Sequence, residues 1–485
     1  MKYVVSPKRA AEIDSYMINT LSIPSLVLME QAAMGIADAV KEFHAAKKVI
    51  VLCGKGNNGG DGYAAARILI TMGYDVCVLA AGEASTDDAK ANAALIKKLG
   101  KLEYIDENSD FFGKHADADI IIDALFGTGL TRTPTGVYAK LIDEINKHTA
   151  KVVSADIPSG VYGANGQTEK AVKADVTVTF QYAKPGHFIY PGREYTGKLI
   201  IKSIGTNEGL IPSKMFHVDS CALEKRRNNT NKGSFGKLSV IAGKKGMAGA
   251  AVMCAKASVA AGSGLTRVGT TEFVMEPVQK NVPEATAVCL GEDTIDAGKA
   301  AAFAEGALAI GPGLGTGEDI YELLLKTLPL SIPKIVDADA LNVIAEHNEL
   351  RALLKGSLIT PHPKEFSRLS GMSMDEILSD PIKATESLSK ELGAAVLLKG
   401  STTVVSDGER TAIVTAGHPG MAKGGSGDVL TGVAGSLTAQ GYTPFEAGYM
   451  AAYFCGKAGE RAAAKKGGYS MSPMDTKDNL SMEQE

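Results

Sequence analysis

A glycine-rich stretch toward the C-terminal end of the chain carries residues suited to phosphoryl transfer. It reads AKGGSGDVLTGVAGS over residues 422–436, and Gly425 to Asp428 stand where an apolar helical pattern begins. A helix that starts in this way presents free backbone N–H groups, which form an anion hole for a transferring phosphoryl group. The Asp428 carboxylate stands where it can deprotonate a hydroxyl group. A glycine-rich helix cap without catalytic function is the alternative interpretation.

Other segments of the second half could complete such a site. Lys399 to Thr403, in LLKGSTTVV, would place a cation and hydroxyl groups near the phosphates of a nucleotide. His362, in TPHPKE, follows a predicted strand and is held between two prolines, a position as consistent with a structural role as with a functional one. The glycine-containing segments 311–315 (GPGLG) and 244–251 (KKGMAGAA) would let backbone line the same cleft.

The first half carries a second glycine-rich turn, GKGNNGGDG, at residues 54–62. It follows the strand pattern VIVLC and precedes the helical pattern YAAARIL, so backbone N–H groups can meet a phosphate or another anion there. Gly54, Gly56 and Gly59 match G-x-G-x-x-G, which also fits an ordinary dinucleotide-binding dehydrogenase domain. The insert NNGGD adds oxygen ligands that the plain fingerprint does not need. A turn without function is the remaining alternative.

Two more predicted strands of the first half end in carboxylates. Asp123 ends the strand pattern of IIIDALFGTGLTR, and Asp156 ends that of VVSADIPSG, with Ser159 just beyond. Ligands of open parallel sheets bind at the C-terminal ends of strands, so these side chains and Asn58 can converge on one crevice. For any single Asp, a helix N-cap is the alternative. Oxygen ligands of this kind suit a hard cation rather than zinc or copper.

These residues need a sheet to position them, and the first half predicts one. Between residues 47 and 203, short Val/Ile-rich runs alternate with helical patterns, which is typical of parallel strands covered on both faces. A helical pattern over residues 7–40 precedes this region. A polar segment, residues 224–234, follows it, and we place the domain boundary near residue 218. The second half has its own αβ alternation, and residues 467–485 predict a polar, mobile tail.

Composition and charge exclude several function classes. The 485 residues suggest two or three domains at about 150 residues each, and 45% hydrophobic with 22% charged residues is typical of soluble globular chains. A net charge of −4 lacks the basic excess of a nucleic-acid-binding chain, so no nucleic-acid partner is expected. The six cysteines have no Cys-x-x-Cys spacing, which indicates thiols in a reducing cytosol. The longest apolar run, Tyr449–Cys455, is far shorter than the ~20 residues of a membrane helix, and no signal-peptide pattern is present. The sequence therefore predicts a soluble, cytoplasmic protein without a membrane partner.

The motifs NNGGDG, DALFGTG and DIPSG, in this order after a helix ending IPSLVLMEQA, resemble the NAD(P)H-hydrate epimerase family, the YjeF N-terminal domain. The resemblance covers essentially the whole first half and implies a Rossmann-like three-layer αβα domain. It implies a potassium ion bound by Asn58, Asp123 and Ser159. It makes Asp156 the candidate acid/base at C6 of a hydrated nicotinamide ring. The implied site for the hydrated nucleotide consists of Asp156 with Asn57, Asn58, Gly59, Gly60, Asp61, Gly127, Thr128, Gly129, Leu130, Thr131, Arg132 and Thr133.

The motifs GPGLG, DADALN, HPKE, LKGST and GSGDVL of the second half resemble the ribokinase-like superfamily and, within it, the ADP-dependent NAD(P)H-hydrate dehydratase family. The resemblance covers nearly the whole second half and implies a ribokinase-like α/β domain. It implies that Gly313, His362 and Asp428 bind the hydrated nucleotide, with Asp428 also catalytic. For the adenine nucleotide, ADP accompanied by Mg²⁺, it implies Lys399, Gly400, Ser401, Thr402, Thr403 and Gly427. Two departures, Lys364 where Gly is common and Asn231 where His is common, lie outside the anion hole.

The two resemblances together predict an α/β protein with an epimerase domain at residues 1–217 and a dehydratase domain at residues 218–485. The predicted function is metabolite repair: the R and S forms of hydrated NADH and NADPH are interconverted, and the S form is dehydrated at the expense of ADP, giving AMP and phosphate. The expected partners are these small-molecule substrates, and a homo-oligomer is the expected assembly. The alternative is a hydroxymethylpyrimidine- or thiazole-type kinase fused to a non-catalytic YjeF-like binding domain. Such a kinase would use Asp428 in the same way, but it would leave Asp123, Asp156 and Ser159 of the first half unexplained.

Overall fold

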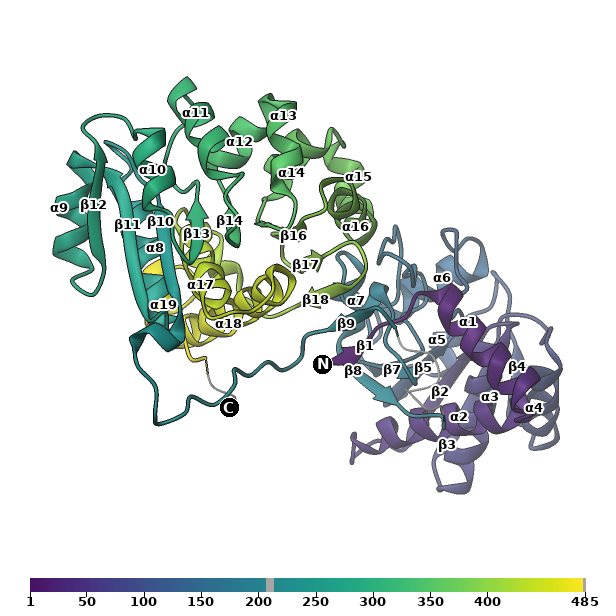
Figure 1. Cartoon of the computed structure of the whole chain (residues 1–485). Helices are drawn as coiled ribbons and strands as arrows, with labels where there is room; N and C mark the ends of the chain where they lie inside the picture. The colour runs from purple at the N-terminus through teal and green to yellow at the C-terminus, as the bar shows by residue number, and fades with distance from the viewer. Residues whose placement is uncertain (206–212, 483–485) are drawn as a thin grey trace. The chain divides into compact units, whose positions relative to one another are not determined.

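The computed structural model describes residues 1–205 and 213–482, apart from the side chains of residues 111 and 112. The chain divides into two compact units, Lys2–Ser213 and Lys214–Glu485, each built around its own sheet (Figure 1). Within the described ranges, no helix combines the length and the apolarity that crossing a membrane requires.

The first unit contains a seven-stranded parallel sheet of Val- and Ile-rich strands. Side chains of β2 alternate between two cores: Val51 packs in the core that includes α2 (Ser25–Lys41) and α3 (Asn57–Thr71), whereas Leu52 packs in the core that includes α6 (Val137–Ile145). Helices therefore cover both faces, which confirms the predicted three-layer αβα architecture. Along the sheet the order is β4 (Leu102–Tyr104), β3 (Asp75–Ala80), β2 (Lys48–Cys53), β5 (Ile120–Ala124), β6 (Lys151–Ala155), β7 (Val176–Phe180) and β8 (Lys198–Lys202).

The helical pattern predicted over residues 7–40 is not one helix. It is divided into α1 (Pro7–Ser15), a π-helical turn (Tyr16–Thr20) and α2. Pro24 is the N-cap of α2, and a proline cannot continue a preceding helix, so the break falls before it. The other α-helices in the described part of this unit are α4 (Asp87–Lys98), α5 (Phe111–Lys114) and α7 (Gly192–Thr196).

The second unit is also α/β, as predicted. Its strands follow the order β9 (Met215–His217), β18 (Thr411–Val414), β17 (Thr403–Ser406), β16 (Ala395–Leu398), β15 (Leu358–Ile359), β14 (Lys334–Val336), β13 (Ala307–Ile310), β10 (Lys237–Ile241), β11 (Leu265–Thr271) and β12 (Thr286–Gly291). Strand β17 runs antiparallel to both neighbours, and the other pairs are parallel.

Helices cover both faces of this second sheet. One core includes α8 (Ala248–Ala260), α17 (Ser426–Ala439) and α18 (Pro444–Lys466). The opposite core includes α10 (Ala297–Phe303), α11 (Glu318–Thr327), α12 (Asp339–Glu346), α14 (Pro363–Ser370), α15 (Met374–Ser379) and α16 (Pro381–Leu392). The remaining helices are α9 (Glu272–Asn281), α13 (Asn348–Arg351) and α19 (Pro473–Asp478).

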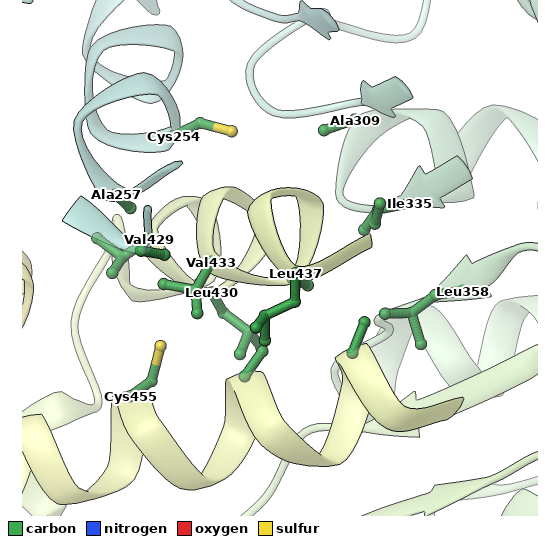
Figure 2. Packing of buried hydrophobic residues seen from close by; sticks show 14 of the residues in the cluster. Cys254, Ala257, Ala309, Ile335, Leu358, Val429, Leu430, Val433, Leu437 and Cys455 are labelled. Carbon is green, nitrogen blue, oxygen red and sulfur yellow. The ribbon is translucent and has the colours of Figure 1, made fainter. Parts of the chain in front are cut away.

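Helix α17, which begins at the glycine-rich stretch, is buried along most of its length. Figure 2 shows Val433 and Leu437 of α17 among Cys254 of α8, Ile335 of β14 and Cys455 of α18. Each Val or Leu buried in this way contributes about 1.5–3 kcal/mol. Helix α17 is therefore a firmly held support for the groups at its N-terminus.

The C-terminal segment differs from the predicted mobile tail. Residues 473–478 form α19, with Pro473 in the first turn and a capping box between Ser472 and Asp475. Met471 and Thr476 are buried. The prediction of a mobile tail is therefore wrong for residues 471–478, because local capping and packing outweigh the polar composition; residues 483–485 lie outside the described residues.

Candidate active sites

A cavity of about 990 Å³ lies in the first unit, next to the segments that follow β2, β5 and β6. The start of α3, the loop after β5 and Asp156 after β6 line it, so the three segments that the sequence predicts to converge do so. The predicted residues that line the cavity are Asn57, Asn58, Asp61, Gly127, Thr128, Gly129, Leu130, Thr131, Arg132 and Asp156.

Three other predicted residues, Gly59, Gly60 and Thr133, lie outside this lining. A Cβ on Gly59 would come within 2.0 Å of the Gly54 carbonyl oxygen, and one on Gly60 within 2.5 Å of the Met29 side chain. These two glycines therefore let the first turn of α3 pack closely against its neighbours. The Thr133 hydroxyl lies 3.4 Å from that of Tyr162. A role for the three residues in substrate binding stays a prediction.

Asp156 has the geometry of a restrained base. Its backbone is left-handed, with φ +64°, and strain of this kind in a non-glycine residue clusters at functional sites. Its Oδ1 accepts hydrogen bonds from Lys184 Nζ (2.5 Å) and Thr179 Oγ1 (3.1 Å), and its Oδ2 accepts one from the Thr128 N–H (3.2 Å). Burial raises the pKa of Asp156, but the Lys184 ammonium outweighs burial and the pKa lies below its ordinary value. Asp156 is therefore an ionised carboxylate at neutral pH.

His187 supports the Asp156–Lys184 ion pair through hydrogen bonds to the backbone of both residues. Its Nδ1 accepts a hydrogen bond from the Lys184 N–H (3.0 Å), so its Nε2–H donates to the backbone carbonyl of Asp156 (2.9 Å). Burial, with the Lys184 charge, lowers the pKa of His187 to about 4. The neutral ring thus fixes the backbone on either side of the Asp156–Lys184 ion pair.

Two further carboxyl groups line the same cavity, and their pKa values are shifted in the opposite direction. Burial, with the Asp156 charge and others, raises the pKa of Asp61 well above its ordinary value. Burial also raises the pKa of Asp14, and the charge of Lys184 opposes this only in part. The cavity therefore combines Asp156, whose pKa is lowered, with Asp61 and Asp14, whose pKa values are raised, and carboxyl groups shifted in opposite directions are suited to exchanging protons with a bound substrate.

Asp123 and Ser159 form a buried group of oxygen atoms beside the cavity loop. The Ser159 hydroxyl donates to Asp123 Oδ1 (2.5 Å), and Asp123 also accepts from the N–H groups of Leu125 and Ser159 and from the Ser154 hydroxyl. These four donors occupy the four lone-pair sites of a carboxylate. A cation on Asp123 must therefore displace one donor, and the Ser159 hydroxyl has a second acceptor within reach, the Phe126 carbonyl at 3.3 Å.

Asn58 has an unsatisfied side chain. Its Oδ1 and Nδ2 are both buried, and neither has a hydrogen-bond partner. A Cβ on Gly127 would lie 3.4 Å from the Asn58 side chain, so Asn58 faces the same loop that carries the Phe126 carbonyl. Buried polar groups are normally satisfied, and an amide oxygen without a partner fits a bound cation. The residues present therefore fit an ion held by oxygen atoms.

In the second unit, the predicted anion hole is the N-terminus of α17. Gly425, the N-cap, has φ +98°, a conformation that glycine adopts without strain, and no side chain caps the helix. The Ser426 N–H donates to the Lys423 carbonyl oxygen (3.2 Å), which leaves the N–H groups of Gly427 and Asp428 available to an anion. Burial and the neighbouring Asp337 carboxylate raise the pKa of Asp428 to about 6, against the opposing charge of Lys399. This pKa is close to neutral pH, as suits a general base.

Lys399 is held beside this helix start by two buried carboxylates. Its Nζ lies 2.9 Å from Asp337 Oδ1 and 3.8 Å from Glu365 Oε2. Asp337 Oδ2 accepts a hydrogen bond from the Thr431 hydroxyl of α17 (2.6 Å). A Cβ on Gly427 would lie 3.6 Å from both Lys399 Nζ and Asp337 Oδ2, so the structure brings together the predicted residues Lys399 and Gly427. A positive charge therefore lies at the edge of the anion hole.

His362 is the N-cap of α14. Its Nδ1 accepts hydrogen bonds from the N–H groups of Lys364 and Glu365, and Glu365 Oε2 accepts one from the His362 N–H. These bonds fix the ring and leave its Nε2 edge, 3.4 Å from Glu365 Oε1, as the side able to meet a ligand. The ring's predicted contact with substrate stays a prediction.

The remaining predicted residues of this unit lie in loops. Gly313 has φ +64°, and a Cβ on it would touch Met247, so the glycine-containing segments 311–315 and 244–251 lie against each other. Gly400, Ser401 and Thr402 connect β16 to β17, which starts at Thr403. The binding of Gly400, Ser401, Thr402 and Thr403 to the adenine nucleotide stays a prediction.

The C-terminal segment braces the glycine-rich loop. Lys423 Nζ donates to the carbonyl oxygens of Tyr469 (2.7 Å) and Met471 (2.5 Å), and a Cβ on Gly425 would come within 3.3 Å of Pro473. The loop that forms the anion hole is thus tied to the segment that the sequence predicts to be mobile.

Replacing Lys423 by Ala is expected to lower kcat/KM at the second unit's site about 10-fold, because a hydrogen bond from a charged donor is worth about 1.5–3 kcal/mol and this lysine is exposed. Steady-state kinetics measure the effect, and the activity of the first unit is expected to be unchanged. Lys465→Ala, which removes a bond to Asn479 farther from the loop, is the matched control. An equal loss of activity in both variants would show that Lys423 does not support the glycine-rich loop in this way.

Comparison with known proteins matches both halves of the chain. A family model described as the YjeF-related protein N-terminus matches residues 25–186, and one described as NAD(P)H-hydrate dehydratase matches residues 238–481. The bifunctional NAD(P)H-hydrate repair enzyme Nnr of Moorella thermoacetica is 34% identical over 510 aligned positions, which cover 99% of this chain and 96% of the relative. The chain belongs to the bifunctional NAD(P)H-hydrate repair enzymes.

A second relative gives the same result. Nnr of Escherichia coli is 36% identical, with 89% of this chain and 84% of the relative covered. An ADP/ATP-dependent NAD(P)H-hydrate dehydratase from Bacillus subtilis, co-crystallised with ATP and Mg²⁺, is 27% identical with a TM-score of 0.47, covering 53% of this chain and 92% of that one. The kinase alternative is not favoured, because the bifunctional relatives align along both halves.

Several residues of these two sites were missed by sequence reasoning. They are Asp14, Thr179, Lys184 and His187 in the first unit, while Asp337, Glu365 and Thr431 of the second unit were noted only as members of DADALN, HPKE and the glycine-rich stretch 422–436. The stretch KPGHFIYPGREYTGK carried a signal, a Lys and a His three residues apart just after a strand.

Proposed function

We propose that this repair enzyme interconverts the R and S forms of hydrated NADH and NADPH in its first unit and dehydrates the S form in its second unit at the expense of ADP, giving AMP and phosphate. The observation that carries the proposal is the pairing of two different proton-transfer sites in one chain. One is the Asp156–Lys184 pair at the cavity, and the other is Asp428 at the start of α17. A dehydratase that accepts one epimer needs an epimerase to use the other.

In the first unit, the chemistry takes place at C6 of the hydrated ring, which bears both a hydroxyl group and the ring nitrogen. The configuration at C6 is lost when either bond opens, and both routes move a proton at the hydroxyl oxygen. Ionised Asp156 can remove that proton, and protonated Asp61 can donate one. Lys184 keeps Asp156 ionised and in place.

In the second unit, Asp428 takes the proton of the C6 hydroxyl group, and the oxygen attacks the terminal phosphorus of ADP. The bond between this phosphorus and the bridging oxygen breaks, and AMP leaves with the electron pair. The N–H groups at the start of α17 and the Lys399 charge stabilise the negative charge on the transferred group. The C6 phosphate ester then leaves as phosphate, C5 loses a proton, and the double bond of NAD(P)H forms. Mg²⁺ enters with ADP as part of the substrate.

The first experiment mixes both epimers of NADH hydrate with the full chain and either ADP or ATP. Complete conversion of both epimers to NADH, with AMP formed from ADP, is expected. Chromatography that separates the epimers provides the readout. If only one epimer disappears, the assignment of the first unit is wrong, and if neither disappears, the assignment of the second unit is wrong.

The dehydratase activity is expected to rise with pH through about 6 and then to level off, because Asp428 accepts a proton only when ionised and its pKa is raised to about 6. The pH profile of kcat/KM for the S form measures this. Epimerisation in the same preparation is the control, since Asp156, with a pKa below its ordinary value, stays ionised over that range. A dehydratase profile that is flat through pH 6 would remove Asp428 from the role of base.

For the first unit we propose a potassium ion held by Asn58, Asp123 and Ser159. The orphaned Asn58 amide and the buried oxygen atoms of the other two residues support it. A bound cation supplies a positive charge that attracts the phosphates of the substrate.

Asn58→Ala is expected to raise the potassium concentration for half-maximal epimerisation at least about 10-fold, because it removes one oxygen ligand of the ion. Titrating epimerase activity with KCl at constant ionic strength measures the shift. Asn108→Ala, an exposed surface change, is the matched control. A wild-type rate that does not depend on potassium would refute the cation site.

We also propose that the enzyme is cytoplasmic, forms a homo-oligomer and binds no nucleic acid. Six free cysteines and a net charge of −4 support a reducing compartment and small-molecule partners.

A further inference from the structure

A thiol, an imidazole and a carboxylate meet in the first unit outside both proposed sites. They belong to Cys77 in β3, Glu103 in β4 and His115 in the turn after α5, and their ligand atoms all lie within 4.8 Å of one another. Cys77 Sγ is 3.6 Å from His115 Nε2. In the described part of the unit, none of the three lines the cavity that contains Asp156.

The sheet register explains why these side chains meet. In the β3–β4 pair, Glu103 stands opposite Leu79, and Leu79 lies on the same face of β3 as Cys77, two residues earlier. Cys77 and Glu103 are therefore diagonal neighbours on one face. His115 reaches this face from the connection between β4 and β5, which places residues 38 positions apart in contact.

The distance between the sulfur and nitrogen atoms fits a tetrahedral metal ion. Bonds of about 2.3 Å to sulfur and about 2.05 Å to nitrogen, at an angle of about 109°, separate the two ligand atoms by about 3.5 Å, close to the 3.6 Å between Cys77 Sγ and His115 Nε2. Sulfur and imidazole ligands suit zinc and do not suit magnesium or calcium. Cys77 and His115 are half-buried and Glu103 is exposed, so solvent can supply both the ion and a fourth ligand.

We infer that Cys77, Glu103 and His115 form a zinc site with one position open to water. The site ties β3, β4 and the loop before β5 together and is independent of the repair activity. The thiolate is the form of cysteine that binds metals, so zinc binding breaks the S–H bond of Cys77, forms the Zn–S bond and releases the proton to solvent.

The test uses the metal-free full chain and cobalt(II) as a spectroscopic probe. One equivalent of Co²⁺ is expected to give a thiolate-to-metal charge-transfer band with release of about one proton, and Zn²⁺ is expected to displace the Co²⁺ and abolish the band without further proton release. Cys77→Ser is expected to abolish the band and to weaken Zn²⁺ binding at least about 100-fold, and His115→Gln to weaken it at least about 10-fold. Cys289→Ser, which removes an exposed thiol elsewhere, is the matched control and is expected to keep wild-type binding.

Two results would overturn the site. One is the absence of a charge-transfer band in the wild-type chain, and the other is a band that survives in Cys77→Ser or disappears in Cys289→Ser. Thermal unfolding of each variant without metal shows that it is folded, and Cys77→Ala repeats the test should Cys77→Ser fail to fold. Zn²⁺ is expected to raise the Tm of the wild type and to leave that of Cys77→Ser unchanged.

Discussion

Replacing Asp428 by Asn is expected to lower the rate of ADP-dependent dehydration by about 10²–10⁴-fold, because it removes the group that deprotonates the C6 hydroxyl. Asn keeps the size and position of the side chain at the start of α17 but accepts no proton. The nucleotide is expected to bind at least as well, since a negative charge beside its phosphates is lost. Single-turnover formation of NADH from the S form separates this loss of rate from binding.

The same variant is expected to epimerise the hydrate at the wild-type rate, because its first unit is unchanged. Asp375→Asn, a change in an exposed first turn of a helix, is the matched control for the substitution itself. Retention of full dehydratase turnover in Asp428→Asn would show that another group is the base. Loss of both activities would indicate misfolding, and Asp428→Ala, assayed in the same way, then provides the second measurement.

The parts of the fold that the sequence predicts are those in which neighbouring residues carry the signal. Val- and Ile-rich runs such as KVIVLC are buried on both faces of a parallel sheet, and both the strands and the three layers followed from them. The glycine-rich starts of α3 and α17 are local in the same sense, because a turn and a helix start are decided within a few residues.

The missed parts depend on contacts between distant residues. Lys184 reaches Asp156 across 28 positions and Lys399 reaches Asp337 across 62, and in both pairs a parallel sheet brings the two segments together. No periodicity records such a pairing. The C-terminal segment is different: the capping box of Ser472 and Asp475 was readable, but a polar composition was given more weight than the cap.

The protonation states of the carboxyl groups in the first unit's cavity are also a property of the folded chain. Asp156 and Asp61 are both aspartates of glycine-rich motifs, yet their pKa values move in opposite directions because only Asp156 accepts a hydrogen bond from Lys184. Sequence alone identifies two carboxyl groups and cannot assign the proton. The proposed roles of base and acid rest on this difference in pKa, which only the folded chain provides.

Replacing Lys184 by Met is the change that tests this division in the first unit. Without the ammonium, burial is left to raise the pKa of Asp156, so the carboxyl group gains a proton and loses its function as a base. Epimerisation at neutral pH is expected to fall by about 10²–10⁴-fold and to recover in part as the pH rises, whereas dehydration of the S form stays at the wild-type rate. Lys90→Met, at an exposed lysine of α4, is the matched control.

Asp156→Asn is expected to lose the same activity without any recovery at high pH. The difference between these two pH profiles distinguishes a lysine that sets the charge of Asp156 from one that only supports the fold, because a structural defect would not be reversed by removing protons.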